Sequence, residues 1–485
     1  MGDRTVIIGA GPAGLTAAYE LAKAGRPPLV LESDPHYVGG IARTVRYKRF
    51  RFDIGGHRFF SKNPEIEALW REVLPDDFLE VPRLSRIYYR GRFFDYPLRP
   101  LNALRNLGPL RSLLCVLSYA RRRLFPIRPE VSFRDWVANR FGDRLFRTFF
   151  ESYTEKVWGM KCGEISADWA AQRIRGLSLT RALLSAFGRT GGAAVKTLID
   201  RFRYPRLGPG QMWEEMHRRV IELGATVLLD RRVVRLDRDA QGVRGIRTVD
   251  SRGGIHDTRC GHLISSMPLR DLVLSLSPPA PPPVRAAAER LRYRDFVTVA
   301  LIARRAAAFP DNWIYIHDPQ VRVGRVQNFR NWSPEMTPDP ERQVLGLEYF
   351  CFEGDGLWTM ADADLLALGE REMVQIGLLG PGEVEDGTVV RMPKAYPVYD
   401  GGYREAVASI RGWLADALPN VAPAGRNGMH KYNNQDHSMM AALLAARNRL
   451  GTDARDPWKV NTDAEYHEEG DDRAGRALPR PVATR

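Results

Sequence analysis

Apolar and polar positions follow a recognisable order at the start of the chain. Residues 4–10 form a short apolar run, residues 15–24 carry leucines and alanines at helical spacing, and residues 28–31 form a second apolar run that ends on Glu32. Strand, glycine turn, helix, strand and acid in this order are typical of a βαβ unit that binds a nucleotide. The pattern predicts an α/β fold with a Rossmann-type first domain.

Further along the chain the period of the pattern changes several times. The elements that it predicts are hairpins at 44–52 and 88–94, helices at 64–70, 98–128 (with a break at 108–109), 133–187, 212–222 and 438–450, and strands at 225–236, 243–249, 262–268, 296–303, 313–317, 321–329 and 344–351. The last four strands alternate as in an antiparallel sheet. From residue 451 onward the chain is polar, and we expect a disordered tail.

The glycine turn at residues 9–14 explains how a dinucleotide would bind. Gly9 allows the tight turn, Gly11 lets the backbone approach a pyrophosphate, and Gly14 lets helix and strand pack closely. Pro12 and Ala13 begin the helix, whose free N–H groups favour a negative charge. Glu32 is placed to accept hydrogen bonds from the adenosine ribose.

A second glycine pair identifies the nucleotide. Gly39 and Gly40, followed by Ala42, come just after Glu32. This stretch resembles the flavin-binding amine oxidase superfamily, in which it runs beneath the FAD ribityl and pyrophosphate. The resemblance implies FAD as the cofactor. A nicotinamide-only domain would not need this second pair.

These elements suggest a discontinuous FAD-binding domain, a helical insertion and a substrate domain built on an antiparallel sheet. The expected division is FAD-binding segments at 1–75, 201–285 and 396–450, a helical substrate or lid region at 76–200, the sheet domain at 286–395 and the tail at 451–485.

Composition narrows the functional classes. Four cysteines lie far apart without a CxxC pair, so we expect reduced thiols and no metal site. The first strand begins close to Met1, and no apolar run approaches the length of a membrane span. We therefore expect a cytoplasmic protein without a signal peptide.

The formal net charge of +14 has several explanations. The arginines are dispersed and no nucleic-acid motif is present, so we expect no nucleic-acid partner. A general preference for arginine, attraction of an anionic sugar nucleotide and contact with an anionic membrane stay open. Residues 98–128 hold seven arginines and no acid among many leucines. This segment is either a solvated helical face packed by its leucines or a peripheral membrane contact.

Five stretches between the N-terminus and about residue 450 together resemble the UDP-galactopyranose mutase family. The two glycine motifs together form the first, and the others are residues 55–60 (similar to a Gly-Pro-His segment beside the isoalloxazine), 153–159 (Tyr-Thr-x-Lys-x-Trp-Gly), 396–400 (Tyr-Pro-Val-x-Asp) and 425–436 (the final flavin-binding segment). Gly324-Arg325 lies where that family places one of two arginines that clamp the substrate diphosphate. The other would be Arg173 or Arg175.

The resemblance implies an isomerase that interconverts the pyranose and furanose forms of a nucleotide sugar for cell-surface polysaccharides. Reduced FAD would be the nucleophile, and NADPH or NADH is a candidate external reductant. The implied catalytic residues are His57, Arg173, Arg325, Tyr396 and Tyr432. The implied FAD contacts, beyond those of the two glycine turns and Glu32, are Gly56, His57, Val234, Gly425, Arg426, Tyr432, Asp436 and Ser438.

Other interpretations of the same residues stay open. Gly56 replaces the proline of the family motif, and the residues after Arg173 do not keep the family's arginine spacing. The two tyrosines could be core aromatics, and Asp436 could be a helix N-cap. The alternative function is an FAD-dependent oxidoreductase that dehydrogenates an amine, a tetrapyrrole-like compound or a polyene. The oligomeric state is left open.

Overall fold

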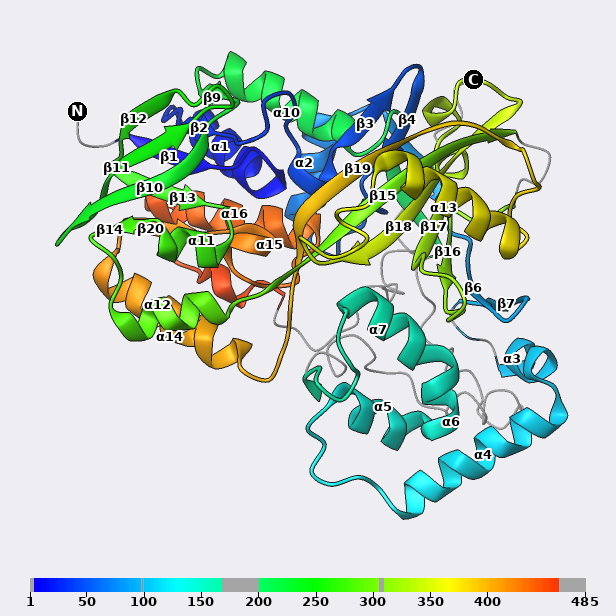
Figure 1. The fold of residues 1–485 in the computed structure, drawn as a ribbon. Helices are drawn as coiled ribbons and strands as arrows, with labels where there is room; N and C mark the ends of the chain where they lie inside the picture. Colours follow the sequence, from blue (N-terminus) through cyan, green and yellow to red (C-terminus); the bar gives the residue numbers. More distant parts are fainter. Residues whose placement is uncertain (1–3, 97, 99, 168–199, 305–308, 462–485) are drawn as a thin grey trace, which may run out of the picture.

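The computed structural model describes residues 4–96, 98, 100–167, 200–304 and 309–461. The predicted fold class is confirmed: helices and several sheets combine in a mixed α/β architecture (Figure 1). Arg173 and Arg175, and the end of the helical segment expected at 133–187, lie outside the described residues.

The first domain is built on a five-stranded parallel sheet assembled from three distant stretches of chain. Its strands, in spatial order, are β20 (Val421–Pro423), β13 (His262–Ser265), β1 (Thr5–Ile8), β2 (Leu29–Leu31) and β9 (Thr226–Leu228). Ile7 of β1 pairs with Ile264 on one side and Val30 on the other. The first strand thus lies at the centre of the sheet, with its glycine turn at the carboxyl end.

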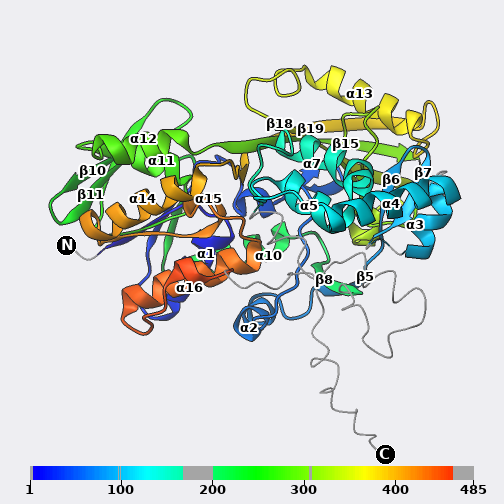
Figure 2. The ribbon, with the colours of Figure 1, turned by 90° about the horizontal axis from the view of Figure 1, so that it is seen from below.

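Two apolar clusters cover the two faces of this sheet, because the central strands are buried on both sides. On the Ile7 face pack α1 (Pro12–Lys23), α2 (Pro64–Val73), α10 (Gly210–Glu222) and α16 (Gln435–Leu450). On the Val6 and Ile8 face pack a four-stranded sheet and three helices: β10 (Arg232–Asp239), β11 (Gly242–Val249), β12 (Ile255–Arg259), β14 (Leu276–Ser277), α11 (Leu269–Leu274), α12 (Pro282–Arg290) and α14 (Tyr403–Ala417). In Figure 2, α16 and α2 lie on one side of the domain and α12 on the other.

The second large sheet has seven strands. In spatial order they are β19 (Val384–Pro397), β15 (Tyr293–Arg304), β18 (Arg342–Cys351), β17 (Arg325–Asn328), β16 (Trp313–Ile316), β6 (Ser85–Tyr89) and β7 (Arg92–Asp95). Helix α13 (Asp362–Gln375) covers one face (Figure 2). The sheet is antiparallel except that β16 pairs in parallel with β6, so the hairpin expected at 88–94 joins it as an edge.

A helical part lies below this sheet in Figure 1. It contains α3 (Pro100–Leu107), α4 (Pro109–Leu124), α5 (Phe133–Phe141), α6 (Asp143–Phe146) and α7 (Ser152–Trp158). The break between α3 and α4 falls at Gly108-Pro109, as predicted. The remaining elements are β3 (Thr44–Tyr47), β4 (Phe50–Asp53), β5 (Phe78–Pro82), β8 (Arg201–Pro205), α15 (Gly425–Gly428) and short helical turns at Gly40–Ala42, Arg147–Glu151, Phe329–Asn331, Pro334–Met336 and Pro457–Lys459.

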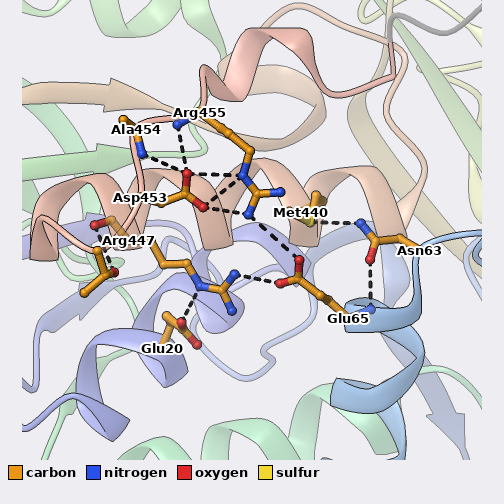
Figure 3. Close-up of polar contacts among 9 residues, drawn as sticks. Glu20, Asn63, Glu65, Met440, Arg447, Asp453, Ala454 and Arg455 are labelled. Atoms are coloured by element: carbon orange, nitrogen blue, oxygen red, sulfur yellow. Dashed lines mark hydrogen bonds and ion pairs between the residues drawn. The ribbon is translucent and has the colours of Figure 1, made fainter.

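The last helix is fastened to the first domain by an arginine at its end. Arg447 donates from Nε to Glu20 of α1 at 2.7 Å and from one terminal nitrogen to Glu65 of α2 at 2.6 Å (Figure 3). Asn63 caps α2 by accepting a bond from the Glu65 amide at 2.9 Å. Three helices from both ends of the chain are therefore held together on this face of the first domain.

Several expected elements differ from the structure. The strand expected at 225–236 is two strands in different sheets, because the chain turns at Asp230, which has a φ of 55°. Strand β19 was not predicted, since its partly buried pattern lacks a long apolar run. Residues 451–461, expected to be disordered, pack against the first domain: Lys431 Nζ donates to the carbonyl of Trp458 at 3.0 Å.

Candidate functional site

The first glycine turn leaves a space that no side chain of the turn fills. Gly9 has a φ of 96°, and a Cβ on Gly14 would lie 1.8 Å from the Gly9 carbonyl oxygen. Both positions therefore need glycine for the turn itself. A Cβ on Gly11, by contrast, would come no closer than 3.9 Å to the neighbouring atoms considered. Glycine at this position keeps room beside the start of α1 rather than relieving a clash.

The second glycine pair closes this space from the other side. Gly39 and Gly40 have φ values of 95° and 53°, and a Cβ on Gly40 would lie 3.6 Å from Gly11 Cα. The Gly39 amide donates to the Ala10 carbonyl at 2.8 Å, which fixes the two turns face to face. The result is a cradle of bare backbone at a helix N-terminus, and it fits the pyrophosphate of FAD.

Glu32 directly follows β2, next to the same turn. Its carboxylate is buried and accepts a bond from the Ala10 amide at 2.6 Å and from the Asp34 amide at 2.9 Å. The residue therefore lies where an adenosine ribose would follow the pyrophosphate. Val234 lies at an irregularity of β10 and is 36% exposed. It is three residues after Arg231, whose backbone amide donates to the Glu32 carbonyl.

The final segment reaches the first glycine turn from the opposite end of the chain. Gly425 has a φ of 82°, and a Cβ there would lie 2.9 Å from Ala13 Cβ. Asn434, not Asp436, is the N-cap of α16, which corrects the alternative reading of Asp436 as a cap. Asp436 lies in the first turn, accepts a bond from Ser61 Oγ at 3.1 Å and has its pKa raised to about 6 by burial. Ser438 is buried in the same helix.

The second half of the site centres on Arg325. It begins β17 and pairs across the sheet with Glu348 of β18. Its Nε donates to one carboxylate oxygen at 3.0 Å and a terminal nitrogen to the other at 2.5 Å, while Gln327 donates to Glu348 at 2.6 Å. Although burial opposes it, the Glu348 charge raises the pKa of Arg325 well above its ordinary value. Within the described part of the chain, the remaining terminal nitrogen of Arg325 has no hydrogen-bond partner, so it can donate to a ligand.

The loop after β4 brings His57 to this pair. A Cβ on Gly55 would lie 3.7 Å from the Glu348 carboxylate, and a Cβ on Gly56 would lie 3.0 Å from the Gln327 amide. The Gln327 side chain thus occupies the space that a proline ring at position 56 would need. His57 Nδ1 is buried, and the described residues provide it no hydrogen-bond partner. This orphaned atom fits a site that is completed by a bound group.

Two stacked tyrosines form another wall. The rings of Tyr396 and Tyr432 lie 5.5 Å apart at 15°, and the Arg426 guanidinium lies 5.1 Å from each ring centroid. Arg426 itself donates to the carbonyls of Asn433 and Ala395, so it joins the final segment to β19. Burial raises the pKa of Tyr396 to about 12, which keeps its hydroxyl protonated as a donor.

Helix α7 supplies a wall that the sequence interpretation did not assign. Tyr153 stacks on His317 at 4.6 Å and 8°, and its ring meets Tyr315 edge-on at 5.5 Å. The charge of Arg325 acts on Tyr153, opposing the burial that raises the pKa of this phenol. The tyrosine therefore belongs to the Arg325 site.

A buried lysine holds this wall in place. Lys156 Nζ donates to the carbonyls of Ile316, Asp318 and Val323, at 3.2, 2.5 and 3.2 Å. These carbonyls span the loop that ends two residues before Arg325. From the opposite side, buried Glu372 accepts bonds from the amides of that loop. Burial lowers the pKa of Lys156 to about 8, which still leaves it mostly charged at neutral pH.

Three histidines in or near these walls are held neutral. Burial lowers the pKa of His57 to about 3, helped by the charge of Arg426; burial likewise lowers the pKa of His317 to about 3 and of His430 to about 4. The unfolded chain has ordinary histidine pKa values near 6.5. Below that pH the unfolded chain binds more protons at these sites than the folded chain does. Each histidine therefore lowers the free energy of unfolding as pH falls.

The folded parent takes up a proton at His430 when it unfolds at acidic pH. In the His430→Gln variant this proton uptake should be absent. The difference between the free energies of unfolding of variant and parent should be constant above pH 7. It should shift in favour of the variant by about 1.4 kcal/mol per pH unit between pH 6 and 4.5. Buried Asp53 and Asp436 titrate in the opposite sense, and their contributions cancel in this difference. Urea unfolding at several pH values measures it, and a difference that stays constant down to pH 4.5 would contradict the expectation.

The structure brings most of the predicted site residues into two adjoining regions. Glu32, Gly39, Gly40 and Gly425 lie around the first glycine turn, while His57, Arg325, Tyr396 and Tyr432 form the second group. Arg173 lies outside the described residues.

The sequence interpretation did not identify four residues of the site: Glu348, Gln327, Tyr153 and Tyr315. For Glu348 a signal was available, because it is the one acid in the otherwise apolar run at 344–351. Among the described residues no cluster of histidine, cysteine and acidic side chains could hold a metal ion.

Residues 12–415 match the flavin containing amine oxidoreductase family. The chain belongs to that family. It is a flavoenzyme of the amine oxidase superfamily, and membership implies FAD in the glycine cradle.

Relatives found by sequence include two kinds of oxidase. Coproporphyrinogen III oxidase of Mycobacterium leprae (strain TN) is 26% identical over 436 residues, which cover 85% of this chain and 91% of that protein. The flavin-containing monoamine oxidase AofH of Mycobacterium tuberculosis (strain CDC 1551 / Oshkosh) is 28% identical over 291 residues. That match spans 57% of this chain and 60% of the length of AofH.

Similar solved structures include isomerases. The structure of reduced UDP-galactopyranose mutase matches with a TM-score of 0.80 over 96% of this chain and 97% of that chain, at 21% identity. A CLA-producing fatty acid isomerase from P. acnes matches with a TM-score of 0.60 over 92% of this chain and 98% of that chain, at 15% identity. These likenesses show a shared fold. No helix among the described residues is long and apolar enough to cross a membrane.

Proposed function

We propose that the protein is an FAD-dependent mutase that interconverts the pyranose and furanose forms of a nucleotide sugar. The observation that supports this best is the site at the end of the glycine cradle. There, the charge of Arg325 acts both on neutral His57 and on Tyr396, which stacks on Tyr432. Such donors suit a diphosphate leaving group.

Each residue has a defined task in this proposal. Arg325 donates to a diphosphate oxygen, held in orientation by Glu348. Tyr396 and Tyr432 donate hydrogen bonds from their hydroxyls to the same diphosphate. Arg173 is the second arginine that binds it. His57 stays neutral, so it adds no charge next to the cofactor. Bound FAD in its reduced form supplies the nucleophilic chemistry, and NADPH or NADH is the proposed reductant.

The aromatic walls account for the exclusion of water. Tyr153, Tyr315 and the stacked tyrosine pair give the site aromatic, largely apolar faces. Because a sugar whose ring opens during the reaction must not be hydrolysed, a dry site suits this chemistry. The same walls would accept a nucleoside base by stacking.

The direct experiment incubates the FAD-loaded enzyme with UDP-galactose and related nucleotide sugars under anaerobic conditions. Dithionite-reduced enzyme should form a second isomer that chromatography separates, and oxidised enzyme should not. An Arg325→Ala variant with full FAD content is the negative control. Conversion by oxidised enzyme alone, or the lack of conversion of any nucleotide sugar, would reject the proposal.

A second candidate is an FAD-dependent oxidoreductase, favoured by the coproporphyrinogen III oxidase match over 85% of the chain. An oxidase must pass electrons to an acceptor at each turnover, so oxygen or another acceptor should disappear in proportion to substrate. Oxygen uptake with coproporphyrinogen or an amine, and none with nucleotide sugars, would favour this candidate.

A substitution of Lys156 tests whether the loop before Arg325 must be held in place for activity. In Lys156→Met the three carbonyl bonds are lost, so the loop before Arg325 should move relative to Tyr153. A displacement of this kind costs roughly ten- to a hundredfold in kcat/KM. FAD content should stay the same, and the KM for the nucleotide sugar should rise more than kcat falls.

The matched control is Lys161→Met, because Lys161 is exposed on the same side of the helical part and pairs only with Glu155 among the described residues. Its kinetics should equal those of the parent. Unchanged kinetics in Lys156→Met would show that the loop does not need this lysine.

A further inference from the structure

The exposed apolar side chains of the protein are concentrated in one short segment. Of the fourteen large apolar side chains exposed in the described chain, eight lie between residues 104 and 131. They are Leu104, Leu110, Leu113, Val116, Leu117, Leu124, Phe125 and Val131, with Leu110, Leu124 and Phe125 at least 70% exposed. Such a cluster on a soluble surface indicates an interaction site.

The exposed leucines of helix α4 lie on its outer face. At about 100° per residue, Leu110, Leu113, Leu117 and Leu124 form one stripe, and the buried residues Ser112, Cys115 and Tyr119 form the opposite stripe. The buried stripe packs toward α5 and α6. Figure 1 shows α4 along the outer edge of the helical part, with α5 and α6 on its inner side. The four leucines of this stripe thus do not pack α4 onto the rest of the helical part.

Arginines border the stripe. Arg105, Arg111, Arg121, Arg123 and Arg128 are exposed, and no acid occurs between Asp95 and Glu130. Arg122 is different: it binds Asp143 of α6 with two hydrogen bonds, at 2.7 and 2.9 Å, and so holds α4 to the helical part. The basic border and the apolar stripe are therefore separate from the groups that fix the helix.

We propose that this face, called here the α4 face and made of the stripe and its exposed arginines, docks onto an anionic lipid surface. A convex helix with leucines in the centre and arginines on both sides matches the boundary between acyl chains and negative head groups. A second copy of the chain would bring the same positive charges together, which disfavours self-association through this face. The proposal is independent of the reaction that the enzyme catalyses.

Co-sedimentation tests the proposal with the FAD-loaded protein. The probes are vesicles of phosphatidylcholine alone and vesicles with about one third phosphatidylglycerol, at low and high salt. The parent protein should pellet with the anionic vesicles at low salt, less at high salt, and little with the neutral ones. Arg121→Ala/Arg123→Ala should weaken binding by about fivefold per arginine. Leu113→Ser/Leu117→Ser should weaken it at both salt concentrations.

Matched controls come from the four-stranded sheet of the first domain. Arg252→Ala/Arg259→Ala and Ile255→Ser change exposed residues of the same kinds and should bind as the parent does. Activity and FAD content of both α4 variants should equal those of the parent. The proposal fails if the parent stays in the supernatant at low salt, or if the α4 variants pellet as well as the controls. It also fails if light scattering without lipid shows dimers that the Leu113→Ser/Leu117→Ser variant abolishes.

Discussion

Purified Gly11→Ala protein should be colourless or should lose FAD on gel filtration, while its apoprotein unfolds at the same temperature as the parent apoprotein. The alanine methyl has room in the chain itself, since neighbouring atoms lie 3.9 Å away, and it points between the two glycine turns. It therefore meets only the pyrophosphate. Overpacking of this kind costs about 1–3 kcal/mol, which corresponds to roughly a five- to 150-fold loss of FAD affinity.

Two other glycine variants complete this test. In Gly14→Ala the added methyl meets the Gly9 carbonyl at 1.8 Å, so this variant should lower the stability of the apoprotein as well. Gly412→Ala, on α14 with nothing within 4 Å, should change neither property. Flavin absorbance per protein and thermal unfolding with and without FAD measure the three variants. A Gly11→Ala protein that keeps tightly bound yellow cofactor would place the pyrophosphate elsewhere.

For Arg325→Lys we expect a loss of activity on the nucleotide sugar of about ten- to a hundredfold, with FAD content unchanged. A lysine keeps the positive charge but can no longer hold both oxygens of Glu348 and donate to a ligand at once. Loss of one charge-assisted hydrogen bond corresponds to about 1.5–3 kcal/mol. Initial rates over a range of substrate concentrations measure the change.

The control for this variant is Arg322→Lys, because Arg322 is exposed and lies in the loop just before Arg325. It should keep the parent's rate. If Arg325→Lys also keeps that rate, the substrate diphosphate does not bind at this arginine.

Local sequence rules predicted the part of the fold that depends on neighbouring residues. The glycine turn at residues 9–14 and the second pair at 39–40 are recognisable because each is contiguous and its backbone requirement acts on those residues alone. The break at Gly108-Pro109 was predictable for the same reason. Proline there begins α4 and glycine ends α3.

Contacts across the sheet could not be predicted in this way. Glu348 orients Arg325 only because β17 and β18 pair in one register, and that register depends on the whole sheet. Tyr153 reaches the site because Lys156 ties α7 to a loop more than a hundred and fifty residues away in sequence. The motif at 153–159 was visible in the sequence, but its physical task became clear from these bonds.

Helix ends show a similar limit. Asp436 and Asn434 both favour an N-cap by residue type. The structure selects Asn434, whose side chain and that of His437 form a reciprocal pair of bonds at the start of α16. The polar composition after residue 451 predicted disorder, whereas Arg411 and Lys431 bind residues 456–460 to the first domain.

Electron counting during anaerobic turnover tests the proposed function most directly. The FAD-loaded enzyme is reduced once, freed of excess reductant and mixed with a large molar excess of a nucleotide sugar that it converts. The proposal predicts many product molecules per flavin, with the flavin absorbance remaining that of the reduced form throughout. Reoxidation of the flavin with at most one product molecule per flavin would show net redox chemistry and contradict the proposed mutase function.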